Sequence, residues 1–387
     1  MSAFHRRIRW ANDTKRQSNN WRDIHANDRG QGRWLVRGQQ RWLNFASNDY
    51  LGLAAHPSVI SAFSGAVEKY GAGSGGSTLI TGHHTLHANL QSQLAEMTHC
   101  EDVLLFGSGF SANQGVLTSL MQQDDLIVQD KLNHASLIDG GLSSAAHNVR
   151  FQHNQIDSAR RQLARAANTK LLVTESVFSM DGDQAPLAEL AHLCAEQKAL
   201  FMVDDAHGLG VIGEQGAGAS SIIAPHKIDV YMATFGKAVG VGGAMVGCDR
   251  DVADYLRQFC RHYIYTTAMP PAQAAAISAA LTCMATEPEH WQNLHHNIQL
   301  FKSLAVDSGI DLLPSDSAIQ PVLIGASEKV IRISEQLRQS GIACGAIRSP
   351  TVKQGQERLR FTLSACHEET DIRQCVSAIA STLEQYA

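Results

Sequence analysis

The sequence predicts an α/β fold, with a large domain built on a mostly parallel sheet and a smaller α+β domain at the C-terminus. Between residues 48 and 283, short apolar runs alternate with segments of helical periodicity, which is typical of parallel strands covered on both faces. Beyond residue 284 the pattern changes to a long amphipathic helix and strictly alternating strands. We therefore expect an accessory segment at 1–47, a large domain at 48–283 and a C-terminal domain at 284–387.

The composition excludes several classes of protein. A chain of 387 residues with 44% hydrophobic and 18% charged residues is expected to be globular and to hold more than one core. The net charge of −5 and the lack of a basic run argue against nucleic acid as a partner. No apolar run has membrane-spanning length, and the first residues lack the apolar core of a signal peptide. Eight scattered cysteines without a C-x-x-C pair indicate free thiols, so a cytoplasmic protein is expected.

The first 47 residues contain one recognisable element, a hairpin at Arg33–Phe45 with two strand-like runs around a Gly turn. The strands expected in the large domain are Val103–Phe106, Leu126–Gln129, Leu171–Glu175, Ala199–Val203, Val230–Thr234 and Ala244–Gly247. Helical periodicity lies between them, for example in the stretch that starts at Pro186 and places Leu187 and Leu190 on one face.

Two patterns define the C-terminal domain. A helical stripe consists of Trp291, Leu294, Ile298, Phe301 and Leu304. Residues 358–363, "RLRFTL", alternate strictly, with Leu359 and Phe361 on one face and Arg358 and Arg360 on the other. This alternation predicts a half-buried strand whose arginines point off the apolar face.

Unusual polar stretches follow five of the strands expected in the large domain. Because ligands bind beyond the carboxyl ends of strands in open α/β sheets, these stretches are expected to form one site. The first, Gly107–Gly115, would present free backbone N–H groups at a helix start, a candidate anion site. It does not match the dinucleotide-binding G-x-G-x-x-G spacing, and by itself an ordinary tight turn would explain it.

Three later residues favour a covalently bound flat ligand. Asp204 ends an apolar strand and His207 follows it, while Lys237 lies among glycines after the next strand. Taken alone, the Asp could be a helix cap and the Lys an exposed side chain. Together, a nucleophilic amine and a carboxylate one strand apart are better explained by a ring with a protonated nitrogen.

A metal site is not expected. His83 and His87 lie four residues apart and could share a helix face, but no third ligand of suitable spacing follows them. A polar helix start explains the pair.

Eight stretches in register resemble the α-oxoamine synthases, a family of fold-type I enzymes dependent on pyridoxal phosphate (PLP). They are "NFASNDYLGLAAHP", "YGAGSGGSTLITGHHTLHANLQSQLAEM", "DKLNHASLIDG", "TESVFSMDGDQAPL", "VDDAHGLGVIG", "TFGKAVGVGGA", "AIRSPTV" and "RLRFTLSACH". The resemblance covers nearly the whole chain. It implies PLP as cofactor and a homodimer with the active site at the interface, where "HYIYTTAMPP" of the second subunit supplies phosphate contacts.

The resemblance also assigns roles to residues. Lys237 would carry the cofactor as an imine and act as catalytic base, and Asp204 would pair with the ring nitrogen. The remaining residues implied at the cofactor are His207 on the phenolic oxygen, His134 on the ring face, Ser179 beside it, and Gly109, Phe110 and Thr234 at the phosphate. Those implied at the substrate are Asn48 and Arg360 on the carboxylate, with His134, Arg22 and Thr351.

Within this family, the chain looks most similar to the branch that condenses L-alanine with a pimeloyl thioester in biotin biosynthesis. The acyl carrier is left open between coenzyme A and acyl carrier protein. Three enzyme alternatives are kept: a glycine C-acetyltransferase, a 5-aminolevulinate synthase, and a dinucleotide-binding oxidoreductase. A catalytically silent protein that binds partners through the same rim is the fourth alternative.

Overall fold

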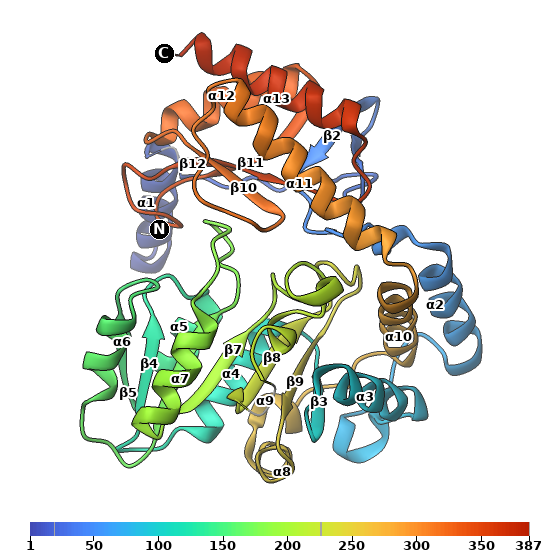
Figure 1. The fold of residues 1–387 in the computed structure, drawn as a ribbon, viewed down its shortest axis with the longest axis vertical. Coiled ribbons are helices and arrows are strands. Elements are labelled where there is room, and N and C mark those ends of the chain that lie inside the picture. The colour runs from blue at the N-terminus through green and yellow to red at the C-terminus, as the bar shows by residue number, and fades with distance from the viewer. Residues whose placement is uncertain (19, 225–226, 387) are drawn as a thin grey trace.

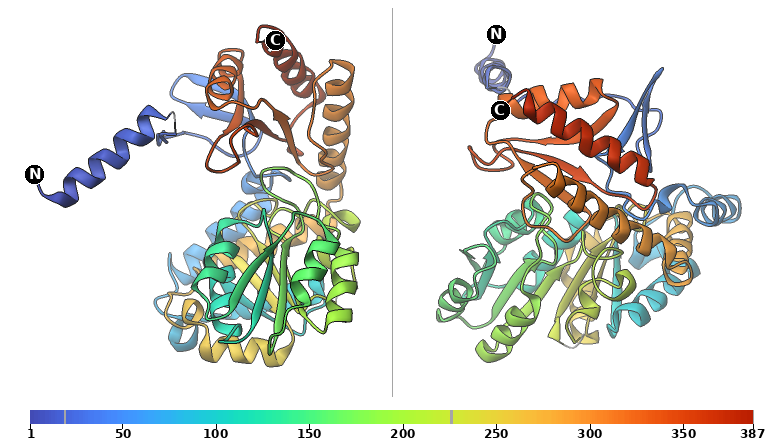
Figure 2. Two further views of the ribbon diagram at one scale, coloured as in Figure 1. Left: turned by 90° about the vertical axis from the view of Figure 1, so that its left-hand side faces the viewer. Right: turned by 45° about the horizontal axis from the view of Figure 1, so that its top comes forward.

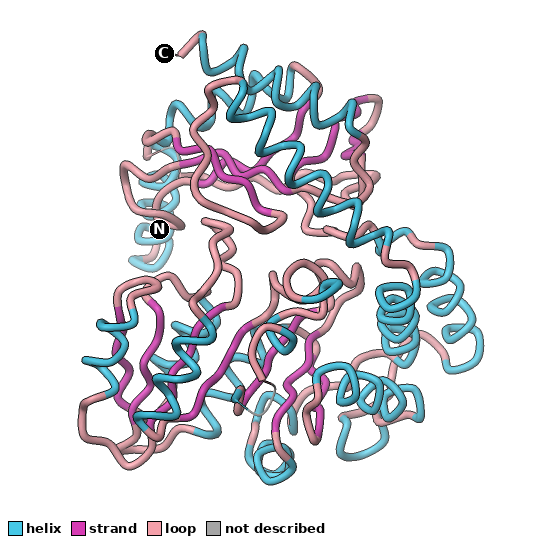
Figure 3. Tube along the Cα trace, in the orientation of Figure 1, coloured by secondary structure: helices cyan, strands magenta, loops and turns pink. Residues whose placement is uncertain are grey.

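A computed structural model describes residues 1–18, 20–224 and 227–386 of the chain. Two sheets face each other across the middle of the molecule, the larger one below and the smaller one above in Figure 1. The loops that leave the carboxyl ends of the large-sheet strands point toward the small sheet (Figure 3). This arrangement confirms the α/β class expected from the sequence.

The large sheet has seven strands in the order β3-β9-β8-β7-β6-β4-β5, and only β9 runs antiparallel to its neighbours. Its strands are β3 (Asp102–Phe106), β4 (Leu126–Asp130), β5 (His147–Phe151), β6 (Lys170–Glu175), β7 (Leu200–Asp204), β8 (Val230–Thr234) and β9 (Ala244–Cys248). The sequence analysis missed β5, because this edge strand is half-exposed and carries few apolar residues.

Alternate residues of the central strands enter two separate cores, one on each face of the large sheet. Leu172 and Val203 belong to one core, and Leu171 and Met202 to the other. Helices that pack on the first face are α3 (Thr85–Thr98), α6 (Ile156–Leu163), α7 (Leu187–Gln197) and α10 (Pro271–Thr286). Those on the second face are α4 (Gly109–Leu120), α5 (Ala135–Ser143), α8 (Arg250–Phe259) and α9 (Arg261–Ile264). Because these strands are buried on both faces, they are continuous apolar runs in the sequence.

The small sheet has five strands in the order β1-β2-β11-β12-β10. They are β1 (Trp34–Arg37), β2 (Gln40–Phe45), β10 (Ile319–Leu323), β11 (Ile342–Ile347) and β12 (Arg358–Thr362). The N-terminal hairpin β1–β2 therefore completes a sheet made by the C-terminal part of the chain, through parallel pairing of β2 with β11. The helices α11 (Glu289–Asp307), α12 (Ser327–Gln339) and α13 (Glu369–Glu384) pack on its outer side (Figure 1).

Other helices lie at the edges. Helix α1 (Ala3–Gln17) projects from the body without a buried residue (Figure 2), and α2 (Pro57–Tyr70) packs along α10. Short helical turns occur at Leu53–Ala55, Thr78–Gly82, Glu214–Gly216 and Ala219–Ser221. None of the helices in the described parts of the chain has the length and hydropathy needed to cross a bilayer.

One expectation about β12 was wrong. The strand was predicted to be half-buried, but all five of its residues are buried, including Arg358 and Arg360. The loop after β6 covers their face: Arg358 pairs with Asp181, and Arg360 Nε donates to the Ser179 carbonyl at 2.7 Å. Alternation correctly places the arginines opposite the apolar face, but it cannot reveal a second layer over the polar face.

Candidate active site

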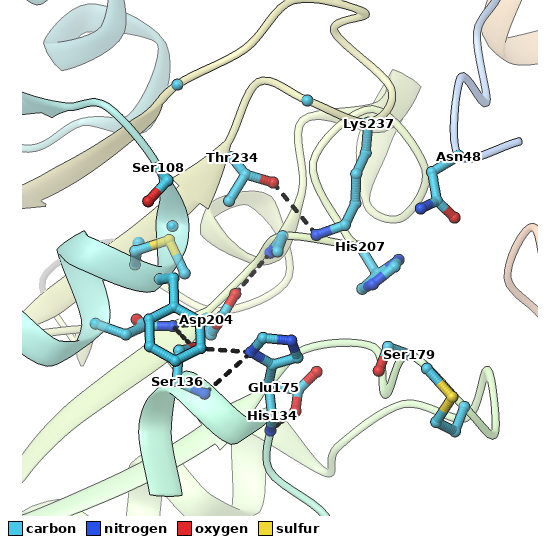
Figure 4. Close-up of a pocket in the computed structure, with 18 of the residues that line it drawn as sticks. Asn48, Ser108, His134, Ser136, Glu175, Ser179, Asp204, His207, Thr234 and Lys237 are labelled. Carbon is cyan, nitrogen blue, oxygen red and sulfur yellow. Dashed lines mark hydrogen bonds between the residues drawn. The ribbon is translucent and has the colours of Figure 1, made fainter. Parts of the chain in front are cut away.

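A cavity of about 440 Å³ opens at the carboxyl edge of the large sheet (Figure 4). Its lining includes ten of the twelve residues that the sequence predicted for the site: Asn48, Gly109, Phe110, His134, Ser179, Asp204, His207, Thr234, Lys237 and Arg360. They come from the ends of β7 and β8, the segments that follow β3, β4, β6, β7 and β8, the segment after β2, and strand β12 of the small sheet. The volume is within the range of small-molecule sites, about 300–1,000 Å³.

Lys237 enters the cavity from the turn between β8 and β9. Its Nζ donates to Thr234 Oγ1 at 3.4 Å, as drawn in Figure 4. Burial lowers the pKa of Lys237, while the carboxylate of Asp204 opposes that shift. Glycine is required close by, because Gly240 has φ of +76° and a Cβ there would lie 2.3 Å from the Ala54 nitrogen. The glycines thus let the turn pack tightly, and a lowered pKa favours a neutral, nucleophilic amine.

Asp204 is held as an oriented carboxylate at the end of β7. It is 4% exposed; Asn113 Nδ2 donates to its Oδ2 at 2.7 Å, and the Ala206 N–H donates to its Oδ1 at 2.9 Å. The same Asn113 amide donates to Ser136 Oγ at 2.9 Å. Two donors therefore orient a buried negative charge beside the cavity, which suits a cationic ring nitrogen as its partner.

The two histidines of the site are held by their Nδ1 atoms. His134 caps the N-terminus of α5 and its Nδ1 lies 2.8 Å from Ser136 Oγ, and His207 Nδ1 lies 2.8 Å from the Tyr50 hydroxyl. Burial lowers the pKa of His134 and, far more strongly, that of His207, where the charge of Lys237 adds to the effect. Both imidazoles are therefore neutral at physiological pH.

The N-terminus of α4 has the geometry of an anion site. Ser108 caps this helix by accepting the Ser111 N–H at 3.2 Å, and the free N–H groups of its first turn lie at the cavity. Gly109 is confined there, since a Cβ on it would meet Thr234 Cγ2 at 2.4 Å. The close approach of α4 to the end of β8 brings Thr234 beside these N–H groups, which suits a phosphate.

Arg360 brings a cation from the small sheet to the opposite side of the cavity. Its Nη1 and Nη2 each donate to Asn48 Oδ1 at 3.3 Å, and Nη2 also lies 3.5 Å from the Tyr50 hydroxyl. These bonds are long and weak, so a ligand carboxylate would compete for the planar guanidinium with better geometry.

Two predicted residues lie elsewhere. Arg22 Nη2 is 3.5 Å from Thr351 Oγ1, so the structure brings this pair together, but both side chains are exposed and neither lines the cavity.

Sequence reasoning gave no role to Asn113, Tyr50 or Glu175, which hydrogen-bond to the predicted residues of the site. Asn113 lies within the Gly107–Gly115 stretch, one helical turn after Gly109, but the spacing of that stretch gives it no role. Tyr50 lies beneath His207 and Arg360. Glu175 ends β6 directly opposite Asp204 and accepts the His134 N–H. The pKa of Glu175 is raised well above its ordinary value, mainly by burial and also by the negative charge of Asp204. The protonated form of Glu175 is therefore favoured.

Comparison with known proteins agrees with this geometry. The family model "Aminotransferase class I and II" matches residues 40–379. The 8-amino-7-oxononanoate synthase of Pectobacterium atrosepticum is 43% identical, over 97% of this chain and 98% of its own length. That of Aeromonas hydrophila is 46% identical, over 92% and 89%. The chain belongs to the 8-amino-7-oxononanoate synthase family.

Solved structures of the wider group have the same fold. Serine palmitoyltransferase from S. paucimobilis, bound to a PLP–myriocin aldimine, matches with a TM-score of 0.92 at 25% identity, covering 100% of this chain and 99% of that one. The 8-amino-7-oxononanoate synthase of Francisella tularensis matches with a TM-score of 0.78 at 28% identity, over 89% and 99%. The family and fold inferred from the eight sequence stretches are thus confirmed.

The residues of the cavity fit pyridoxal phosphate as a group. The Lys237 amine, with its lowered pKa, can form an imine with the cofactor's aldehyde. The buried Asp204 carboxylate, which accepts two hydrogen bonds, can face the ring nitrogen. The glycine-confined N-terminus of α4 provides donors for its phosphate.

Proposed function

We propose that this chain binds pyridoxal phosphate and condenses L-alanine with a pimeloyl thioester to give 8-amino-7-oxononanoate, CO₂ and the free thiol carrier, a step of biotin biosynthesis. The observation that carries this proposal is the convergence of Lys237 and Asp204 on one cavity, in a chain 43–46% identical to synthases of that name.

When bound, the cofactor supplies an electron sink for the pair left on the alanine Cα after its proton departs. Lys237 is proposed to hold it covalently and Asp204 to pair with its ring nitrogen. Gly109, Phe110 and Thr234 would hold the phosphate end. His207 would bond the ring's phenolic oxygen; its Nδ1 is already engaged by the Tyr50 hydroxyl.

The residues of this chain bind the substrate and move its protons. Arg360 and Asn48 bind the alanine carboxylate, and Lys237, displaced by the alanine amine, takes the proton from Cα as a neutral base. Cα bonds to the thioester carbonyl carbon, and the thiolate leaves and is protonated. The carboxylate is then lost as CO₂ and a proton returns to Cα. The Lys237 amine would then displace the amine of the product, which leaves, and Lys237 would again hold the cofactor. Neutral His134 can donate a hydrogen bond to the substrate carboxylate or the new carbonyl.

The acyl donor and the assembly are finer parts of the proposal. The pimeloyl group is carried by coenzyme A or by acyl carrier protein, with Arg22 and Thr351 outside the cavity as donor contacts. We also propose a homodimer in which residues 262–271 of one subunit reach the phosphate end of the other's site. Exposed apolar side chains support it: Phe110 at the cavity is 42% exposed, and Tyr265 is 73% exposed. Light scattering of the purified holoenzyme tests the dimer.

The reaction is tested by combining spectroscopy with turnover. The purified protein should be yellow, and borohydride should bleach it and fix the cofactor's mass on Lys237. Lys237→Ala should lose both the colour and the product. Alanine with pimeloyl thioester should outrun glycine with acetyl-CoA; the reverse ranking would make the chain a glycine C-acetyltransferase instead. A colourless protein that binds NAD would reject the cofactor assignment.

A further inference from the structure

Three side chains that can bind metal ions meet where α2, α10 and α11 come together (Figure 1). His56 precedes α2 as its N-cap, Glu287 ends α10 and His290 lies in the first turn of α11. One ligand atom from each lies within 4.8 Å of the others, and none of the three lines the cavity described above. The proposed function leaves this cluster without a role.

The distances within the cluster resemble those around a tetrahedral metal ion. Glu287 Oε2 lies 3.2 Å from His56 Nε2 and 3.4 Å from His290 Nε2. Charge-assisted hydrogen bonds are shorter, about 2.7–2.9 Å. A tetrahedron with metal–ligand bonds of about 2.0–2.1 Å has edges of about 3.3–3.4 Å. Two edges of such a site are therefore close to the expected length, and the third, between the two histidine nitrogens, lies within 4.8 Å and has to shorten when an ion binds.

The surroundings of His290 prepare it as a ligand. Its Nδ1 lies 3.1 Å from the Leu51 carbonyl, which can only accept, so Nδ1 carries a proton and Nε2, 3.4 Å from Glu287 Oε2, is the atom that can bind a metal once it is unprotonated. This is the arrangement that metal-binding histidines usually have, with the second ring nitrogen donating to a backbone carbonyl or carboxylate.

His56 requires a change of tautomer. Its Nδ1 accepts the Ser58 N–H at 3.3 Å, so in the ion-free cluster Nε2 carries the proton toward Glu287. When Nε2 binds a metal, that proton moves to Nδ1, which gives up its hydrogen bond from the Ser58 N–H and finds the Cys283 sulfur 3.5 Å away as an acceptor.

We propose that His56, Glu287 and His290 bind one Zn²⁺ ion, with the fourth position left to water. Two imidazoles and a carboxylate suit a borderline ion better than the oxygen-preferring Mg²⁺ or Ca²⁺. The ion would tie the helices that flank the large sheet to α11 on the small sheet, so its role would be structural. The competing interpretation is a carboxylate that merely pairs with two histidines.

The test uses the intact holoenzyme, stripped with chelator and titrated with Co²⁺ while its visible ligand-field bands are recorded, followed by displacement with Zn²⁺. One equivalent should bind with tetrahedral bands, and Zn²⁺ should raise the melting temperature. Glu287→Gln and His290→Gln should each weaken binding at least about tenfold, the loss typical of damage to a metal site. His192→Gln is the matched control, because His192 pairs with Glu196 at 3.1 Å outside the cluster.

The melting temperature of each variant is also measured without metal. A variant that melts like the metal-free wild type but binds Co²⁺ weakly has lost a ligand rather than its fold. The proposal is overturned if the wild-type protein takes up no stoichiometric Co²⁺, or if Glu287→Gln and His290→Gln bind it as tightly as His192→Gln. Neither result would touch the proposed condensation, because the cluster shares no residue with the cavity.

Discussion

The ion pair between Arg358 and Asp181 fastens the small sheet to the loop after β6. The Arg358 side chain is 4% exposed and that of Asp181 is 25% exposed. Asp181→Ala would leave the buried guanidinium with two backbone acceptors, the Gln356 carbonyl at 2.9 Å and the Met180 carbonyl at 3.5 Å. We expect this substitution to destabilise the fold and to loosen the active-site loop.

The magnitude follows from what remains around Arg358. Removing one partner of a buried ion pair typically costs about 3–5 kcal/mol. The two backbone carbonyls still accept hydrogen bonds from Arg358, and water reaches the side of the pair where Asp181 lies. We therefore expect Asp181→Ala to lower the free energy of unfolding by about 2–3 kcal/mol. Arg358→Met combined with Asp181→Ala should cost less than Asp181→Ala alone, because no charge is left buried.

The assay is urea unfolding of the holoenzyme at one fixed protein concentration. The matched control is Glu328→Ala, which removes an ion pair with Arg332 in which both side chains are more than 60% exposed, and which should cost about 0–1 kcal/mol. Because Arg360 Nε donates to the Ser179 carbonyl in the same loop, KM for alanine should also rise. The reasoning fails if Asp181→Ala is no less stable than the control, or if the double variant is the least stable.

Three further predictions concern single side chains. Arg360→Lys should raise KM for alanine about 10–100-fold in steady-state assays, since an ammonium cannot make two parallel bonds to a carboxylate; an unchanged KM would exclude Arg360 from the substrate. Asn113→Leu leaves Asp204 Oδ2 without its donor at a cost of about 1.5–3 kcal/mol, so cofactor affinity, titrated by absorbance, should drop tenfold or more; wild-type affinity would contradict this. Burial alone would lower the pKa of His153, but Asp130 and Asp183 raise it to about 10 from an ordinary 6.5. That charge stabilises the fold fully below about pH 6.5 and its contribution is lost as the pH rises through about 10, so unfolding of His153→Gln should depend less on pH over this window than that of the wild type; identical pH dependence would refute the assignment.

Local sequence patterns determined much of the large sheet and its polar edge. Six strands were predicted within a residue or two, because strands buried on both faces are continuous apolar runs that end abruptly at polar stretches. Parallel strands place these ends at one edge, so the polar stretches after them could be gathered into one site without coordinates, whereas Asn48 and Arg360 were added only by the family resemblance. The individual roles of the site residues came from the family resemblance and stay predictions.

Only the tertiary structure decided which distant segments meet. Asn113 reaches Asp204 across 91 positions, and the loop after β6 covers the arginines of β12 across about 180. The hairpin β1–β2 joins a C-terminal sheet, and His56 meets Glu287 and His290. Alternation and periodicity report whether a residue faces an apolar layer, but not which strand pairs with it or which loop lies above it. Strand order and the packing of one layer on another depend on the whole chain, and those contacts orient the charges of this site.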